Sequence, residues 1–272
     1  MKTQLLTLTS VMIFMFFGFT DQELPKVVEN DSPTKLRKIN NKAFKAGEVL
    51  HYRLHYGIIN AGTAKLEVKK LDKKIAGREI YHIIGSGRSK GAFDWFFKVR
   101  DQYETYLDVD GVFPWMFVRN VREGGYKLKQ TYKFAQNKNE VDNGKGKTFD
   151  APSGVQDMLS AFYYARSIDY SNAKKGEIFT IWSFVDDEIW PLKIRFLGRE
   201  KIKVSGQKYR ALKFCPVVQE GRLFKDENDV SVWISDDGNK IPLLASGKVF
   251  VGSIKFELIS AKGLANPSAK IK

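Results

Sequence analysis

Hydrophobic and polar residues alternate along most of this chain, which is the pattern of half-buried β-strands. From position 50 to 56, leucines and tyrosines fill the even positions, while His51, Arg53 and His55 fill the odd ones. A two-residue period places the two sets on opposite faces of a strand. Strand-like runs recur later, at 64–68, 79–85, 98–107, 114–121, 126–134, 178–185, 192–204, 209–218, 229–235 and 243–260. The chain is therefore predicted to be mainly β.

One segment in the middle of the chain has a helical period instead. Apolar residues recur at helical spacing from Val155 to Ile168, and Ser153 precedes them in the position of an N-cap. Phe162-Tyr163-Tyr164 gives this helix a broad aromatic face. Such a face has to be buried, and the concave side of a sheet is where we expect it.

The strand-like runs before and after this helix are related by an internal repeat. Similar segments begin at three pairs of positions: Ala46 and Lys175, Gly77 and Gly206, and Asp110 and Asp237. The first two pairs are both 129 residues apart. Duplication of a β-unit predicts two related antiparallel β-units joined by one linking α-helix. They would form a sandwich or an open barrel of lipocalin or lipoprotein-carrier type, folded around an apolar interior.

These patterns divide the chain into six regions. We expect a signal peptide at 1–20, a flexible lead-in at 21–45, a first β-unit at 46–150, a linking helix at 151–172, a second β-unit at 173–263 and a tail at 264–272. Glycine-rich or polar stretches at 85–91 and 137–147 are predicted to be loops, and the tail is predicted to fray.

The N-terminal region has the layout of a secretory signal peptide. Lys2 precedes an apolar run from Leu5 to Phe19, and the small residues Gly18 and Thr20 stand before an acidic segment. An uncleaved membrane anchor is the alternative, although the run is shorter than the roughly 20 apolar residues of a full span. No cysteine lies near the cleavage region, which excludes a lipoprotein. We expect an exported protein, periplasmic or outer-membrane associated.

Charge narrows the class of partner. The formal net charge is +14, which favours anionic partners such as lipid headgroups or acidic glycans. A solvated cationic surface is the simpler interpretation, because the lysines are spread through the chain. No nucleic-acid-binding motif is present, so nucleic acid is not expected as a partner. The single cysteine, Cys215, lies between Phe214 and Pro216, which indicates an ordinary buried thiol.

Two clusters of side chains are candidates for binding. His51, Arg53 and His55 would stand in one row at a spacing of roughly 6.5 to 7 Å, able to hold an anion, but a solvent-facing strand has the same composition. Residues 93–97 contain four large aromatic side chains. We favour a core position for them; exposed, they would form the lip of an apolar cavity or an edge that touches a membrane.

The candidate ligand-binding residues form a set of nine, and no catalytic residue, metal ligand or cofactor is assigned. Pairs of acids such as Asp186-Asp187 and Asp236-Asp237 occur in turn-like settings, where turn geometry alone explains them. No nucleophile elbow, zincin helix or serine–histidine–aspartate arrangement is present. The nine candidates are His51, Arg53, His55, Tyr56, Trp95, Phe162, Tyr163, Trp182 and Trp233.

Three parts of the chain carry a resemblance to a known family. They are 47–64, the helical segment Asp157–Arg166, and the strand Val232–Asp237 with the Ile241-Pro242 pair that follows it. Together they resemble the exported bacterial family called domain of unknown function 3108, over roughly 47–259. The resemblance implies an envelope protein of a Gram-negative bacterium with a β-rich fold. It implies no established activity and supplies no catalytic residues.

Three hypotheses of function follow. The first is a non-catalytic envelope protein that binds a lipid, an acylated molecule or an anionic glycan within the β-scaffold. The second is an enzyme acting on acidic polysaccharide, with a lyase-like site in which His51, Arg53 and His55 hold the substrate and a tyrosine is acid or base. The third is a structural or interaction module that contacts the membrane surface or another envelope protein. A cavity between the helix and the sheets would favour the first.

Overall fold

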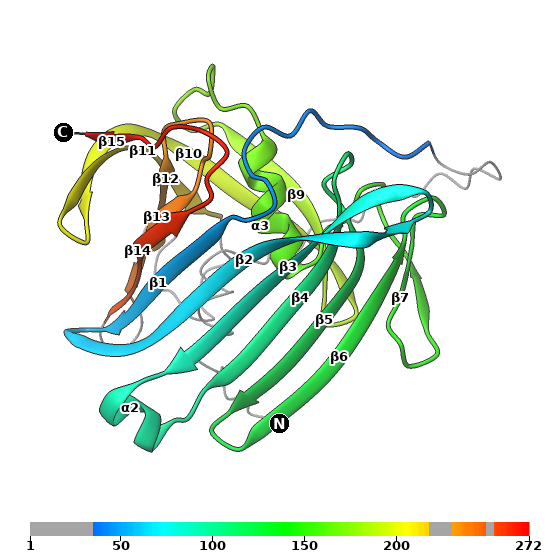
Figure 1. Cartoon of the computed structure of the whole chain (residues 1–272), viewed down its shortest axis with the longest axis horizontal. Coiled ribbons are helices and arrows are strands. Elements are labelled where there is room, and N and C mark those ends of the chain that lie inside the picture. The colour runs from blue at the N-terminus through cyan, green and yellow to red at the C-terminus, as the bar shows by residue number, and fades with distance from the viewer. Residues whose placement is uncertain (1–34, 218–229, 249–252, 272) are drawn as a thin grey trace.

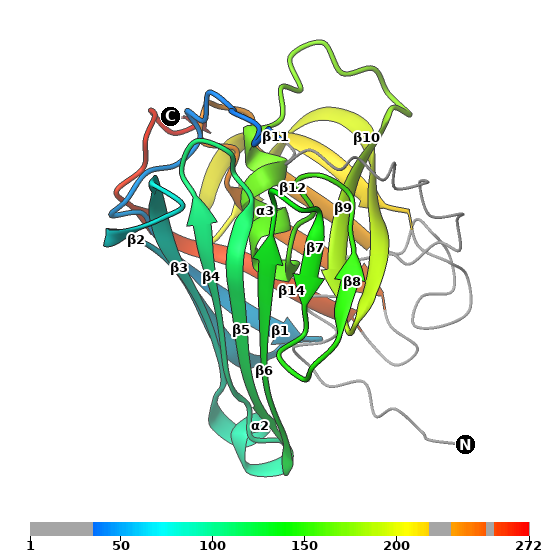
Figure 2. The same ribbon diagram turned by 90° about the vertical axis from the view of Figure 1, so that its right-hand side faces the viewer.

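In the computed structural model, which describes residues 35–217, 230–248 and 253–271, one antiparallel sheet curls around a helix (Figures 1 and 2). The helices are α2 (Gly91–Phe96) and α3 (Met158–Ser167). The strands before α3 are β1 (Val49–Tyr56), β2 (Ile59–Ile75), β3 (Arg78–Ser89), β4 (Arg100–Asp108), β5 (Pro114–Glu123), β6 (Tyr126–Ala135), β7 (Glu140–Asp142) and β8 (Thr148–Asp150). The strands after it are β9 (Ile178–Val185), β10 (Glu188–Val204), β11 (Gln207–Pro216), β12 (Val230–Ser235), β13 (Pro242–Lys248), β14 (Ser253–Lys262) and β15 (Lys270–Ile271).

The sheet consists of an eight-stranded meander, β1 to β8, and a six-stranded meander, β9 to β14. Its order from one end is β9 to β14, then β1 to β8, and β1 pairs with β14 where the meanders meet. Strands β1, β2 and β3 begin 129 residues before β9, β10 and β11 respectively. The structure therefore confirms two related antiparallel units with one linking helix.

Equivalent turns of the two units share an unusual backbone conformation. The β2–β3 turn contains Ala76 at φ 48° and Gly77 at φ 76°, and the β10–β11 turn contains Ser205 at φ 47° and Gly206 at φ 82°. Two consecutive left-handed residues are the requirement of a two-residue hairpin turn that matches the twist of the flanking strands. Gly77 and Gly206 recur in the two units because the second position of each turn requires a left-handed backbone, which glycine adopts without strain.

The two units share their apolar interior. One cluster combines Leu50 and Tyr52 of β1 with Leu243 of β13 and Phe256 of β14. The ring of Tyr52 stacks on Phe256 with the centroids 4.3 Å apart. A second cluster joins α3 and the lead-in to β2 through β6. The open-barrel alternative thus describes the fold, because one curved sheet surrounds one interior.

The two ends of the sheet, β8 and β9, are not paired with each other, and they meet at a seam held by side chains and by the backbone of Gln156. Residues 151–157 run between β8 and β9, where the Gln156 amide bonds the Trp182 carbonyl at 2.8 Å. The fully buried Phe184 of β9 packs its ring against Tyr132 and Phe149, with centroids 4.9 and 5.2 Å apart. Aromatic packing across the seam fixes the curvature of the sheet.

Helix α3 begins later than the sequence pattern predicts. Asp157 is its N-cap, because the carboxylate accepts the amides of Leu159 and Ser160 at 2.7 and 2.8 Å. The Ser160 hydroxyl accepts the Asp157 amide at 2.9 Å, which completes a capping box. The prediction of Ser153 as N-cap is wrong, since the chain does not enter the helix before Asp157 and Gln156 still bonds the backbone of β9.

This N-cap predicts a measurable pH dependence. Burial raises the pKa of Asp157 to about 6, against the hydrogen bonds from Thr105 and the helix amides, which lower it. Between about pH 4 and 6 the folded state then binds more protons than the unfolded state, so stability falls as pH rises. Asp157→Asn keeps the cap acceptor without the titration. We expect wild type to lose up to about 3 kcal/mol relative to this variant between pH 4 and 7. Urea unfolding of both proteins across this pH range measures the difference. Equal changes of unfolding free energy with pH in wild type and Asp157→Asn would contradict the assignment.

Several segments predicted to be irregular are ordered. Arg37 of the lead-in donates to the carbonyls of Gly111 and Val112, both at 2.7 Å, and Phe44 is buried. In the tail, β15 pairs with β11 and Ala269 is fully buried. The predictions of a flexible lead-in and a frayed tail are therefore wrong for residues 35–45 and 264–271. The predicted signal peptide, 1–20, lies outside the described residues.

The glycine-rich stretch that was predicted to be a loop belongs to strand β3. Gly85 pairs with Leu66 of β2 and Tyr103 of β4, so the ladder continues on both sides. A Cβ on Gly85 would lie 3.2 Å from the Leu66 side chain and 3.7 Å from Leu159 of α3. Small residues here let the helix lie close to the sheet. Of the predicted loop 137–147, residues 140–142 form β7, and the predicted strand 243–260 overlaps both β13 and β14.

Candidate functional site

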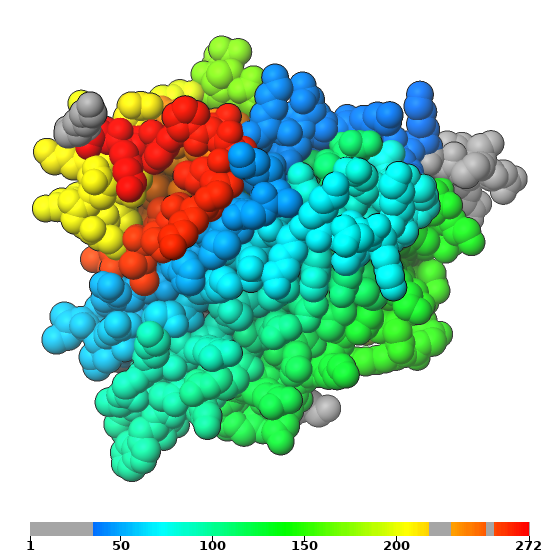
Figure 3. Space-filling model, in the orientation of Figure 1, coloured from blue at the N-terminus to red at the C-terminus, as the bar shows by residue number. Residues whose placement is uncertain are grey.

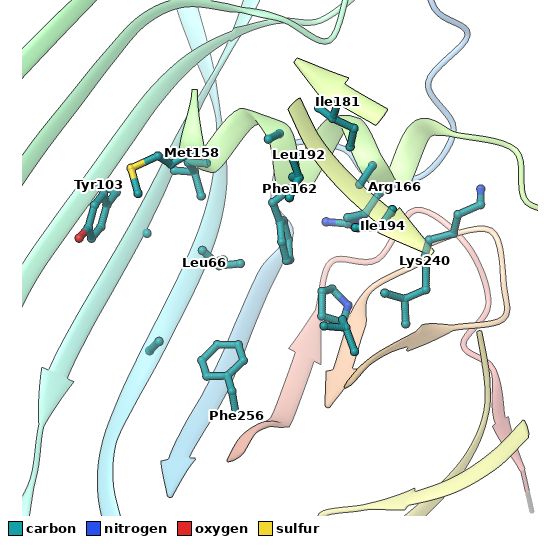
Figure 4. Close-up of a pocket in the computed structure, with 18 of the residues that line it drawn as sticks. Leu66, Tyr103, Met158, Phe162, Arg166, Ile181, Leu192, Ile194, Lys240 and Phe256 are labelled. Carbon is teal, nitrogen blue, oxygen red and sulfur yellow. The ribbon is translucent and has the colours of Figure 1, made fainter. Parts of the chain in front are cut away.

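A cavity of about 160 Å³ lies between α3 and the inner face of the sheet (Figure 4). It is lined almost wholly by apolar side chains from both β-units and from the helix. The principal lining side chains are Ala64, Leu66, Tyr103, Met158, Leu159, Phe162, Ala165, Ile181, Leu192, Ile194, Phe214, Val232, Ile234 and Phe256. The duplicated sheet therefore encloses an apolar site that neither unit forms alone.

Helical spacing and strand alternation position these side chains. Met158, Phe162 and Ala165 stand four and three residues apart, so they share the face of α3 that meets the sheet. Leu66 of β2 and Phe256 of β14 point inward from neighbouring parts of the sheet. Figure 4 shows the Phe162 ring extending from the helix toward Leu66 and Phe256. Phe162 is thus the central side chain of the cavity.

A buried ion pair fixes the end of α3 at the cavity. The Arg166 guanidinium donates to both carboxylate oxygens of Glu48, at 2.6 and 2.7 Å. It also donates to the carbonyls of Asn239 at 3.0 Å and Ala43 at 3.2 Å. Burial lowers the pKa of Arg166, but Glu48 more than offsets this effect and the pKa is raised. The charge is neutralised inside the protein, so Arg166 holds the helix in place.

Lys240 supplies a second cation near the cavity. It follows β12 in a left-handed conformation with φ 47°, and it is among the lining residues. Burial lowers its pKa, while Asp169 and Asp237 act in the opposite direction. Lys240 gives the apolar cavity one edge that is basic.

A family described as a protein of unknown function, DUF3108, matches residues 51–259. This chain belongs to that family. The match confirms the resemblance drawn from the sequence. This chain is also similar to a solved structure, the β-barrel-like protein of domain of unknown function DUF1849 from Brucella abortus, with a TM-score of 0.52 and 12% sequence identity. The alignment covers 81% of this chain and 98% of the other, and it shows a shared fold. No curated protein matches the chain.

The histidine–arginine row of the DUF3108 protein lies on the outer face of β1. Arg53 and His55 both contact the Glu257 carboxylate of β14, at 3.5 and 3.1 Å. His51 is exposed on the same face, whereas Leu50 and Tyr52 point into the core. The alternation predicted two faces correctly. None of the three row residues lines the cavity.

The remaining candidates are dispersed. Phe162 lines the cavity, while Tyr163 is buried beside it against Phe44, with ring centroids 4.9 Å apart. Tyr56 packs against the core near the end of β1. Trp182 and Trp233 alternate with cavity-lining neighbours, so they stand on the opposite face of their strands, and Trp233 donates to Glu200.

The aromatic run at 93–97 corrects a prediction. Trp95 and Phe96 are 82% and 72% exposed, because α2 projects beyond the end of the sheet. A core position was predicted and is wrong for both. Sequence reasoning also missed Leu66, Leu192 and Phe256, although each lies in a predicted strand, because alternation alone does not show which part of a face the helix leaves uncovered.

Residues 35–217, 230–248 and 253–271 contain no group of three or more histidine, cysteine, aspartate or glutamate side chains placed to hold a metal ion. In the same ranges, no helix has the length and apolar character needed to cross a bilayer.

Proposed function

We propose that this protein is an exported, non-catalytic carrier or sensor that holds an acyl chain of a lipid or acylated molecule in the cavity beneath α3. The observation that supports the proposal is the chemistry of the lining, which is almost wholly aliphatic and aromatic. Burial of acyl methylene groups stabilises a complex by about 0.8 kcal/mol for each group removed from water. The cell envelope is the compartment in which such ligands are abundant.

The size of the cavity limits what it holds. A sealed apolar cavity of about 150 Å³ in another protein accepts one benzene-sized molecule. At about 160 Å³ this cavity accommodates a short segment of one chain and not a whole phospholipid. The remainder of the ligand would lie outside the cavity. A carboxylate or phosphate on that part is compatible with the basic edge at Lys240.

The alternatives are less well supported. A glycan would leave hydroxyl groups without hydrogen-bond partners in this apolar lining, which is unfavourable for each group. The polysaccharide enzyme required a groove lined by His51 and His55, but neither lines the cavity. An acyl chain therefore fits better than either a glycan or a polymer substrate.

A blocked cavity provides the test. Ala165 is half-buried on the cavity face of α3, so Ala165→Trp places an indole in the space. The helix tolerates tryptophan at a cost of about 0.5 kcal/mol. We expect delipidated wild type to bind dodecanoate, and A165W to bind it at least tenfold more weakly by isothermal titration calorimetry.

The matched control places the same side chain outside the barrel. Thr180 of β9 is exposed and alternates with the cavity-lining Ile181, so Thr180→Trp leaves the cavity unchanged. T180W should bind as wild type does. Absence of dodecanoate binding by wild type, or equal affinity of A165W and wild type, would refute the proposal.

A further inference from the structure

The topology gathers three connections at one end of the sheet. Because neighbouring strands are antiparallel, the β1–β2 turn, the β3–β4 connection with α2, and the β5–β6 turn all lie at the same end of the strands (Figure 1). The connections also bond to one another or to adjacent strands. The Lys90 amide donates to the Ala61 carbonyl at 2.9 Å, and the Gly124 amide to the Lys98 carbonyl at 3.0 Å.

This end carries most of the exposed large hydrophobic side chains. Seven such residues occur in the described part of the chain, and the five with the greatest exposure are all here. Single exposed hydrophobic residues are ordinary, but a cluster at one end of the sheet marks an interaction site. We call the five residues the apolar tip: Ile58 at 99%, Ile59 at 52%, Trp95 at 82%, Phe96 at 72% and Tyr126 at 52% exposure.

The aromatic part of the tip is held in a fixed conformation. Asp94 of α2 accepts two hydrogen bonds from Arg100, at 2.6 and 3.0 Å, and one from Ser89. These bonds tie α2 to the ends of β3 and β4. Trp95 packs edge-on against Phe96 with ring centroids 5.1 Å apart. The local structure thus presents both rings to solvent.

Cations surround the tip, while nearby acids are withdrawn from the surface. Exposed cationic side chains flank it at Lys90, Lys98, Arg122, Lys127 and Lys129. Of the neighbouring acids, Asp101 and Glu123 are buried, and Asp94 is paired with Arg100. The surface around the tip is therefore positive. The surface of this end of the molecule, which carries α2, is seen at the lower left of Figure 3.

We infer that the apolar tip docks this protein onto the surface of an anionic phospholipid bilayer. Tryptophan and phenylalanine flanked by lysine and arginine fit the boundary between headgroups and acyl chains. Projecting side chains on three separate connections enter a fluid interface more readily than they fit a rigid protein surface. The cations attract the negative surface potential within a Debye length. The inference stands on residues that take no part in the cavity.

Vesicle flotation tests this interaction, using phosphatidylcholine vesicles with and without phosphatidylglycerol. We expect wild type to float with the anionic vesicles only, and to be released by high salt. Trp95→Ser/Phe96→Ser should weaken binding at least tenfold. The control Ile178→Ser/Ile259→Ser, at the two exposed hydrophobic residues outside the tip, should bind as wild type does.

Charge reversal provides an independent comparison. Lys98→Glu/Lys127→Glu should weaken binding to anionic vesicles, whereas Lys70→Glu/Lys201→Glu, with the same net charge change away from the tip, should have a much smaller effect. Equal binding by W95S/F96S and wild type would overturn the inference. A dimer in light scattering that dissociates in W95S/F96S would instead assign the tip to a second copy and also overturn it. The cavity-blocking A165W should still bind vesicles, so failure of either proposal is separable from the other.

Discussion

Replacing Arg166 by methionine is expected to lower the free energy of unfolding by about 3 to 5 kcal/mol, because it leaves a buried carboxylate without a counter-ion. Glu48 is fully buried and has both oxygens bonded to Arg166. The substitution also removes donors to the carbonyls of Ala43 and Asn239, which belong to segments distant in the sequence. Urea unfolding at pH 7 measures the loss.

Two variants separate the buried charge from lost packing. Glu48→Gln/Arg166→Met removes both charges, and we expect it to recover a substantial part of the loss. Arg53→Met is the exposed control, because its ion pair with Glu257 is longer, at 3.5 Å, and lies on the outer face. It should cost less than about 1 kcal/mol. A loss below about 1 kcal/mol for R166M would show that the pair does not anchor the helix.

Replacing Phe184 by alanine is expected to destabilise the protein by about 3 to 5 kcal/mol and to loosen the seam. The Phe184 ring is fully buried and packs against the rings of Tyr132, Phe134 and Phe149, which come from β6 and β8. Truncation creates a cavity where the two ends of the sheet meet. Urea unfolding measures the loss of stability. Relative to wild type, amide hydrogen exchange in Phe184→Ala should accelerate in β7, β8 and β9 more than in β1.

A phenylalanine on the same strand provides the control for the seam. Phe179 of β9 is only partly buried and packs against Tyr170, with ring centroids 4.9 Å apart. Phe179→Ala should cost less than Phe184→Ala and leave exchange in β7 and β8 unchanged. Equal exchange patterns in the two variants would mean that Phe184 does not hold the seam together.

The sequence predicted those features that depend on neighbours along the chain. Alternation identified the strands and separated Tyr52, which faces the core, from His51 and Arg53, which face outward. The duplication was visible because equivalent turns need glycine in the left-handed conformation at Gly77 and Gly206. Local conformational requirements leave a mark at a fixed position in the sequence, and such marks can be recognised without a structure.

Features that depend on how the sheet curves back on itself could not be predicted in this way. Glu48 and Arg166 are 118 residues apart, and nothing near either residue indicates the other. Asp186 and Asp187 were predicted correctly as turn residues, and both have positive φ. Their contacts with Arg119 and Tyr132 across the seam follow only from the curvature of the sheet. The cavity has the same origin, because it is the space that α3 leaves inside the curved sheet.

The two proposals describe different parts of one molecule. Gly85 and Tyr103, which line the cavity, lie in the halves of β3 and β4 that lead toward α2 and the apolar tip. A protein that docks with this end would bring the cavity-bearing half of the sheet toward the bilayer.

The most direct test of the central claim, that an acyl chain occupies the cavity beneath α3, is photo-crosslinking with a dodecanoate that carries a terminal diazirine. After irradiation and proteolysis, mass spectrometry locates the modified residues. The account predicts labels on cavity-lining residues such as Phe162, Leu66 and Phe256, which unlabelled dodecanoate suppresses and A165W prevents. Labels confined to α2 and the outer face, or labels that unlabelled dodecanoate does not suppress, would contradict it.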